Sequence, residues 1–264
     1  MTAPTRSDLL ATIVAATRTA VAWRELAQPI DSRRAGVPVP DGARFAAALT
    51  DSATPRIIAE CKRRSPSRGI LRDAYDPAAH ASAYADAGAA AISVLTEPTF
   101  FDGALAHLEA VRAAVGLPVL RKDFIVTDYQ VHEAAALGAD AVLLIVAVLD
   151  DPSLTRLHRL AVNQGLAVLV EVHDGEELGR ALAAGARIIG VNSRNLRTLD
   201  VDLDVIERLA PAIPDEIIAV AESGIRTGDD IRRFSALGYD AFLVGERLIG
   251  RDDPGAALRE LRAS

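Results

Sequence analysis

The chain is poor in the residues that build disulfide-rich, metal-rich and nucleic-acid-binding proteins. Its 264 residues include one cysteine, Cys61, which excludes an internal disulfide framework and a cysteine-rich metal cluster. Acidic residues outnumber basic ones by 36 to 29, so the formal net charge is −7 and no basic footprint for nucleic acid is present. The scarcity of cysteine suits a reducing compartment, and we expect a cytoplasmic location.

Long hydrophobic segments are also missing. The longest unbroken apolar run, residues 141–149, has nine residues, whereas a helix needs roughly 20 to cross a bilayer. The N-terminal stretch MTAPTRSDLL has no apolar region of the kind that signal peptides carry. We therefore expect no membrane partner and no nucleic-acid partner.

The apolar half of the chain predicts a parallel sheet covered by helices. Aromatic residues make up only 4% of the sequence, so aliphatic side chains dominate. Apolar runs typical of buried strands begin near residues 57, 91, 118, 141, 167, 188, 217 and 241, and an amphipathic helical stretch fills each gap.

An internal repeat indicates how these eight strand–helix units close. Segments 86–95, 136–145, 183–191 and 236–244 each contain a helix end, a glycine and then a strand. Two units repeated four times predict a (β/α)8 TIM barrel. An open doubly wound sheet is the alternative, but it usually has a glycine-rich turn after its first strand, which is lacking here.

Residues 1–50 precede the regular part. Ser7 or Asp8 can cap a helix that runs to about Leu26, and Asp41 can cap a second helix at residues 43–49. We expect residues 1–50 to form a helical extension that packs on the barrel of residues 51–264, within a single domain overall.

Ionisable and polar residues gather where the predicted strands end. Catalytic groups of such barrels lie at the C-terminal ends of strands. Glu60 and Lys62 are two residues apart and face the same side, whereas Cys61 between them faces the helices. The residues at these ends are Glu60, Lys62, Lys122, Glu171, Asn192, Arg194, Glu222, Ser223 and Gly245.

Their residue types leave several roles open. Lys122 could be a Schiff-base nucleophile, a general acid or an ion-pair partner. Glu171 could be a base or the counter-ion of Lys122. Asn192 and Arg194 could bind substrate oxygens or tie loops together.

Two turns predict a phosphate site. Ser223-Gly224 and Gly245-Glu246 follow the last two strands, and glycines there let backbone N–H groups approach an anion. Two ordinary tight turns are the alternative. His173 reads as a helix-capping residue, and no histidine pair has metal-ligand spacing, so we expect no metal.

With these residues placed, the chain resembles the indole-3-glycerol phosphate synthase family. The resemblance covers the whole barrel through the motifs IAECKRRSPSRG (58–69), ISVLTEPTFFDG (92–103), LRKDFIV (120–126), LVEVHD (169–174), GVNSRNLRTLDVD (190–202), VAESGI (220–225) and VGERLI (244–249). The family also carries extra helices before the first strand that lie over the barrel mouth. Cys61, Arg68 and the first 50 or so residues depart from the family pattern.

The resemblance implies a carboxy-lyase of tryptophan biosynthesis. It would convert 1-(o-carboxyphenylamino)-1-deoxyribulose 5-phosphate into indole-3-glycerol phosphate without a cofactor. The implied catalytic residues are Lys122 as general acid, Glu171 as acid/base in dehydration, Glu60 as an assisting acid/base and Lys62 near the anionic groups of the substrate. The implied binding residues are Ser65, Phe124, Asn192, Arg194 and Glu222 for substrate, and Ser223, Gly224, Gly245 and Glu246 for phosphate.

Other functions compete with this one. Phosphoribosylanthranilate isomerase would require a Cys/Asp acid–base pair that points into the barrel, whereas Cys61 is expected to face outward. A non-catalytic barrel that binds a sugar phosphate would have lost Lys122 or Glu171, and both are present. A paralogue in specialised indole metabolism would keep all these residues and stays open. A monomer is the expected state, with a weak dimer as the alternative.

Overall fold

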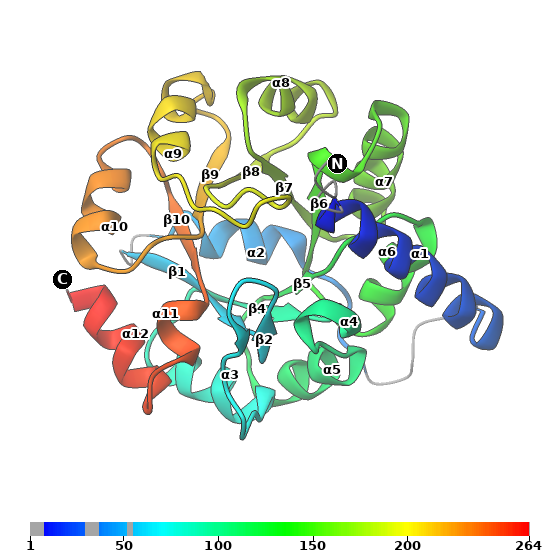
Figure 1. Cartoon of the computed structure of the whole chain (residues 1–264), viewed down its shortest axis with the longest axis horizontal. Helices are drawn as coiled ribbons and strands as arrows, with labels where there is room; N and C mark the ends of the chain where they lie inside the picture. Colours follow the sequence, from blue (N-terminus) through cyan, green and yellow to red (C-terminus); the bar gives the residue numbers. More distant parts are fainter. Residues whose placement is uncertain (1–7, 30–36, 52–54, 264) are drawn as a thin grey trace, which may run out of the picture.

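Eight parallel strands close into a barrel (Figure 1), which confirms the predicted (β/α)8 architecture. The structure is a computed structural model that describes residues 8–29, 37–51 and 55–263. Around the barrel the strands follow the order β1-β10-β9-β8-β7-β6-β5-β4, and β4 pairs with β1. Their bounds are β1 (Arg56–Cys61), β4 (Ala91–Leu95), β5 (Val119–Lys122), β6 (Ala141–Ile145), β7 (Ala167–Val172), β8 (Ile188–Asn192), β9 (Ile218–Glu222) and β10 (Ala241–Val244).

Helices follow the strands and cover the barrel from outside (Figure 1). The four glycines of the repeat, Gly88, Gly138, Gly185 and Gly238, have positive φ where helices end, as predicted, and Gly165 after α7 does the same. A small antiparallel hairpin, β2 (Arg64–Ser65) and β3 (Gly69–Ile70), lies in the loop after β1. The covering elements are α3 (Pro77–Asp86), α4 (Pro98–Phe101), α5 (Leu105–Ala114), α6 (Asp128–Ala136), η1 (Val146–Val148), α7 (Asp151–Asn163), α8 (Gly175–Ala183), α9 (Asp204–Leu209), η2 (Ala210–Ala212), α10 (Gly228–Ser235), α11 (Glu246–Ile249) and α12 (Pro254–Ala263).

Alternation along each strand divides the core into two parts. Inward residues such as Ile58 and Leu120 fill the barrel, whereas Ile57 and Val119 pack under the helices. Cys61 belongs to the outer part, as its position in the strand predicts, and its Sγ lies 3.7 Å from the carbonyl oxygen of Pro77. Among the described residues, no helix combines the length and the hydropathy needed to span a bilayer.

The two N-terminal helices lie at opposite ends of the barrel, which corrects the expectation that both cover the mouth. Asp8 caps α1 (Leu9–Ala27) and Asp41 caps α2 (Gly42–Ala48). The N–H of Gly42 donates to the carbonyl of Gly165, just before β7, so α2 closes the N-terminal end. Its side chain Phe45 is fully buried there, and Figure 1 shows α2 over the middle of the strand ring.

Helix α1 is anchored at both of its ends. Asp8 pairs with Arg197 in the loop after β8, and Arg24 makes a bidentate pair with Glu133 of α6 at 2.9 and 3.0 Å. Between these anchors, Ile13 lines the cavity at the C-terminal end of the strands. The extension therefore contributes one wall of the barrel mouth.

A buried ionic network continues from α1 into β5. Arg121 is fully buried, and its Nη2 lies 2.9 Å from Asp123 Oδ2 and 2.8 Å from Glu133 Oε2. Its Nη1 donates to the carbonyl of Gln130 at 2.9 Å. Because Arg121 and Lys122 are neighbours on one strand, their side chains point to opposite faces. The network thus fixes the outer face of the strand whose inner face presents Lys122.

We predict that Glu133→Ala destabilises the protein by about 3 kcal/mol, because it leaves the buried Arg121 with one carboxylate partner fewer. Arg24→Ala removes the partly exposed arm of the same network and should cost about 1 kcal/mol or less. Urea unfolding followed by circular dichroism measures both. Equal midpoints for the two variants would contradict a network centred on Arg121.

We also predict that Cys61 resists alkylation in the native protein. Burial raises the pKa of its thiol, and only the thiolate reacts. Iodoacetamide at pH 8 should label Cys61 after denaturation and leave the folded protein unlabelled, as mass spectrometry would show. Fast labelling of the native protein would mean that the outer layer opens readily.

Candidate active site

A cavity of about 680 Å³ opens at the C-terminal ends of the strands. This cavity is lined by every residue that the sequence analysis predicts to be a site residue, from strands in both halves of the barrel. Additional lining residues are Ile13 from α1, Arg68 from the hairpin loop and Phe101 from α4. The predicted residues that meet here are Glu60, Lys62, Ser65, Lys122, Phe124, Glu171, Asn192, Arg194, Glu222, Ser223, Gly224, Gly245 and Glu246.

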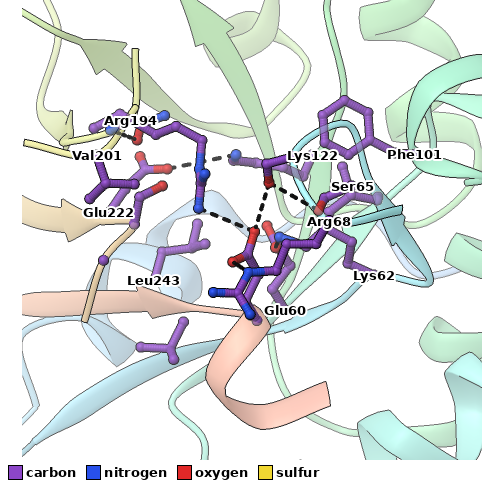
Figure 2. Close-up of a pocket in the computed structure, with 18 of the residues that line it drawn as sticks. Glu60, Lys62, Ser65, Arg68, Phe101, Lys122, Arg194, Val201, Glu222 and Leu243 are labelled. Carbon is purple, nitrogen blue, oxygen red and sulfur yellow. Dashed lines mark hydrogen bonds and ion pairs between the residues drawn. The ribbon is translucent and has the colours of Figure 1, made fainter. Parts of the chain in front are cut away.

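Lys122 stands between two buried carboxylates. Its Nζ lies 3.5 Å from Glu171 Oε2 and 3.7 Å from Glu222 Oε2, and Figure 2 shows Lys122 and Glu222 reaching into the same space. Burial alone lowers the pKa of Lys122, but Glu171, Glu222 and Glu60 outweigh burial and raise it above its ordinary value. The side chain is therefore held as an ammonium ion.

A second ion pair lies beside the first. Lys62 Nζ is 2.5 Å from Glu60 Oε1, which agrees with the prediction that the two side chains share one face. Burial raises the pKa of Glu60, but Lys62 and Lys122 outweigh it and hold the pKa below its usual range. These two lysines are the only lysines in the chain, since every other basic side chain apart from histidine is arginine.

Glu171 and Glu222 share Lys122 but have opposite pKa shifts. Burial opposes ionisation of both groups, yet Lys122 and then His173 lower the pKa of Glu171. For Glu222, burial and the neighbouring Glu171 charge outweigh Lys122 and raise the pKa to about 8. The pair therefore holds one carboxylate and one carboxylic acid near neutral pH, which is the arrangement that acid–base chemistry requires.

The turn after β9 has an unusual backbone. Ser223 and Gly224 both have positive φ, at 66° and 73°. A left-handed serine is uncommon, and the Ser193 hydroxyl supports it by donating to the carbonyls of Glu222 and Ser223 at 3.2 and 3.1 Å. Successive residues in such conformations turn backbone N–H groups toward an anion.

The side chain of Glu246 is not placed to bind a phosphate. Its carboxylate pairs with Arg194 at 3.1 Å and with Arg68 at 3.2 Å. A carboxylate repels phosphate, so only the backbone N–H of Glu246 is suited to an anion there. Arg68, which sequence reasoning noted only as a departure from the family pattern, adds a positive charge at this edge of the cavity (Figure 2).

Other parts of the cavity lining are aromatic or carry small polar groups. The rings of Phe124 and Phe101 lie 6.1 Å apart, centre to centre. Ser65 is buried in the hairpin, and its hydroxyl is 3.2 Å from that of Ser67. Asn192 Oδ1 accepts a hydrogen bond from the N–H of Arg194 at 2.9 Å. These parts of the lining suit a flat aromatic group with polar substituents.

Sequence reasoning missed His173 as a neighbour of the site. Its Nε2 lies 3.4 Å from Glu171 Oε1, behind the cavity wall. His173 directly follows β7, and extending the alternation of that strand by one residue would have predicted that its side chain points to the same side as Glu171. Among the described residues, no group of three or more His, Cys, Asp or Glu side chains is placed to hold a metal ion.

Comparison with known proteins identifies the family of this chain. The indole-3-glycerol phosphate synthase family model matches residues 10–261. The chain belongs to the indole-3-glycerol phosphate synthase family. Relatives of that name include a Nocardioides sp. protein, 53% identical over 96% of this chain and 98% of the relative, and a Parafrankia sp. protein, 54% identical over 84% of this chain and 83% of the relative.

Solved structures share the fold at much lower identity. The 3-hexulose-6-phosphate synthase from Salmonella typhimurium has a TM-score of 0.64 and 15% identity, covering 79% of this chain and 97% of that chain. At this identity the likeness shows the barrel alone. The indole-3-glycerol phosphate synthase assignment rests on the family match and on the close relatives.

We predict that Gly190→Ala lowers kcat/KM by about 100-fold, because even a small displacement of a catalytic group is costly. A Cβ at Gly190 on β8 would overlap Glu222 Oε1 and press on Leu169. Gly179→Ala on α8 is the matched control, since a Cβ there meets no atom within 4 Å. Full activity in Gly190→Ala, with circular dichroism showing a native fold, would contradict the tight fit around Glu222.

Proposed function

We propose a division of labour for the indole-3-glycerol phosphate synthase activity that family membership gives this chain. The reaction converts 1-(o-carboxyphenylamino)-1-deoxyribulose 5-phosphate into indole-3-glycerol phosphate with loss of carbon dioxide and water. In this proposal Lys122 is the acid that closes the ring. The observation that carries it is the Lys122 ammonium held at the cavity between two buried carboxylates.

Substrate binding uses the two unlike sides of the cavity. The phosphate lies against the backbone N–H groups of Ser223, Gly224, Gly245 and Glu246, where the turn geometry favours an anion. The aromatic carboxylate end lies at the other side, next to Phe124, with Ser65 and Asn192 as hydrogen-bond partners. Arg194 and Lys62 offset the negative charge of the substrate between these ends.

Ring closure requires a proton at the carbonyl oxygen. As the ring carbon that bears the carboxylate attacks the carbonyl carbon, Lys122 donates a proton to the oxygen, which becomes a hydroxyl group. The carboxylate then leaves as carbon dioxide, and its bonding electrons restore the aromatic ring. The step is redox-neutral, so it calls for no external electron acceptor.

Dehydration follows at the same centre. Glu171, ionised beside Lys122, takes the proton from the carbon next to the ring nitrogen, while the Lys62–Glu60 pair supplies the proton with which the hydroxyl group leaves as water. Glu60, paired with Lys62, assists this proton transfer, and Glu222 holds Lys122 in place. The product then contains the closed indole ring and the glycerol phosphate side chain.

The charge state of Lys122 favours the acid role over the other chemistry open to a lysine. A Schiff-base nucleophile must be a neutral amine, whereas the carboxylates around Lys122 raise its pKa. Every residue of the proposed site comes from one chain, so a monomer would suffice for activity. A phosphorylated small molecule in the cytoplasm is the partner that fits this proposal.

We predict that Lys122→Met lowers kcat by at least about 100-fold, because it removes the donor and keeps the side-chain length. The rise of indole fluorescence on incubation with the carboxyphenylamino-deoxyribulose phosphate measures turnover. Arg259→Met, which removes an exposed charge on α12, is the control and should match the wild type. Binding of the substrate to the wild type without turnover would favour a non-catalytic barrel.

Trapping with cyanoborohydride tests the rival role of Lys122. The acid role predicts that substrate plus cyanoborohydride leaves Lys122 unmodified, as peptide mass spectrometry would show. The measurement is simple to interpret because the chain has only two lysines. A reduced adduct on Lys122 would overturn the acid assignment and support a Schiff base.

A further inference from the structure

A chain of three ionisable groups leads from the cavity into the loop after β7. His173 Nε2 lies 3.4 Å from Glu171 Oε1, and His173 Nδ1 lies 3.0 Å from Glu177 Oε2 on α8. The imidazole thus stands between two carboxylates, one in the cavity wall and one behind it. His173 is not among the described residues that line the cavity.

Glu177 is itself held in a fixed position. Its carboxylate accepts the backbone N–H of His173 at 2.8 Å, and its own N–H donates to the N-capping side chain of Asp174 at 2.8 Å. The predicted capping function of this segment is therefore carried by Asp174 and Glu177. The imidazole of His173 is left to face Glu171.

The two oxygens of Glu171 have different neighbours. Oε2 faces Lys122 at 3.5 Å, and Oε1 faces His173. The charged groups that face the imidazole are Glu171 from β7 and Glu177 from α8. Glu222 neighbours Lys122, on the Oε2 side of Glu171.

We propose that His173 is a positioning residue, which as an imidazolium between Glu171 and Glu177 keeps the Glu171 carboxylate ionised and aimed into the cavity. This inference rests on the proposed function, because it supports the residue that takes the proton during dehydration. Glu171 is almost fully buried, so its ionised form depends on the positively charged and hydrogen-bonding groups around it, Lys122 first and then His173.

The electrostatics agree with this geometry. Burial lowers the pKa of His173, but Glu171 and Glu177 outweigh it and raise the pKa to about 10. In return, after Lys122, His173 is the main group that lowers the pKa of Glu171. Removing the imidazolium must therefore raise the pKa of Glu171, so the inactive protonated form appears at higher pH than in the wild type.

The first test is independent of activity. Long-range 1H–15N NMR spectra of the free protein follow each of the five imidazoles with pH, and the signal missing from His173→Gln identifies His173. We expect wild-type His173 to stay protonated through pH 8. Glu177→Gln should lower its midpoint by about one pH unit or more, because one of two carboxylates within contact distance is lost.

Glu176→Gln is the matched control for that experiment. It removes the same charge from the neighbouring position of α8, where the side chain is exposed, and should leave the His173 titration unchanged. A wild-type His173 that titrates near the ordinary imidazole pKa, or a Glu177→Gln variant with an unchanged midpoint, would overturn the proposal.

The second test is the pH profile of kcat/KM for His173→Gln. This variant keeps a neutral hydrogen-bond donor but lacks the charge, so its acid-side decline should begin at higher pH than in the wild type. The ratio of activity at pH 5 to that at pH 7.5 should fall at least about threefold relative to the wild type. A uniform loss at all pH values would mean that His173 is merely structural and would overturn the proposal.

The two tests separate the possible failures. Absence of turnover in the wild type would refute the proposed function, while the NMR titration still decides whether His173 is held as an imidazolium. If His173→Gln does not fold, the Glu177→Gln titration decides the charge of His173. Normal turnover together with an ordinary His173 titration would refute only the role given to His173.

Discussion

Several ionisable side chains are buried together at the C-terminal end of the barrel, and their burial governs how the surrounding strands and helices are arranged. Lys122, Glu171 and Glu222 are nearly removed from water, and isolated charges would be expensive there. They are tolerated because a closed barrel brings the ends of β5, β7 and β9 to one point, where the Lys122 ammonium meets the ionised Glu171 and Glu222 is protonated near neutral pH. The same closeness drives the pKa values of Glu171 and Glu222 apart.

The strand that presents Lys122 is held from its other face. Arg121 and Asp123 flank the lysine along the chain, and alternation sends Arg121 outward into a second buried ionic network. That network reaches α1 through Glu133 and Arg24, so the helix that walls one side of the cavity is coupled to the strand that carries the acid. The segment LRKDF therefore supplies both the proposed acid, Lys122, and the ion pair of Arg121 and Asp123 that holds its strand in place.

Sequence reasoning found most of the scaffold because its signals are local. Strand starts, the helix-ending glycines and the opposite directions of Glu60 and Cys61 all follow from short-range periodicity and backbone preference. The position of α2 does not follow from such local signals, because the pattern of residues 42–48 predicts a helix but not which end of the barrel the helix closes. The ion pairs of the Glu246 side chain were not predicted for a similar reason, since its arginine partners lie in distant loops.

Periodicity and motifs along the chain were enough to predict the barrel, the strand ends that carry chemistry, and a family resemblance that implies the reaction. Which charges meet became clear from the folded chain alone: Lys122 lies between Glu171 and Glu222, Glu246 faces arginines, and His173 lies against Glu171 instead of capping a helix. The physical reason is that periodicity is encoded within a few residues. Electrostatic pairing depends on distances of a few ångströms between residues that the chain separates widely.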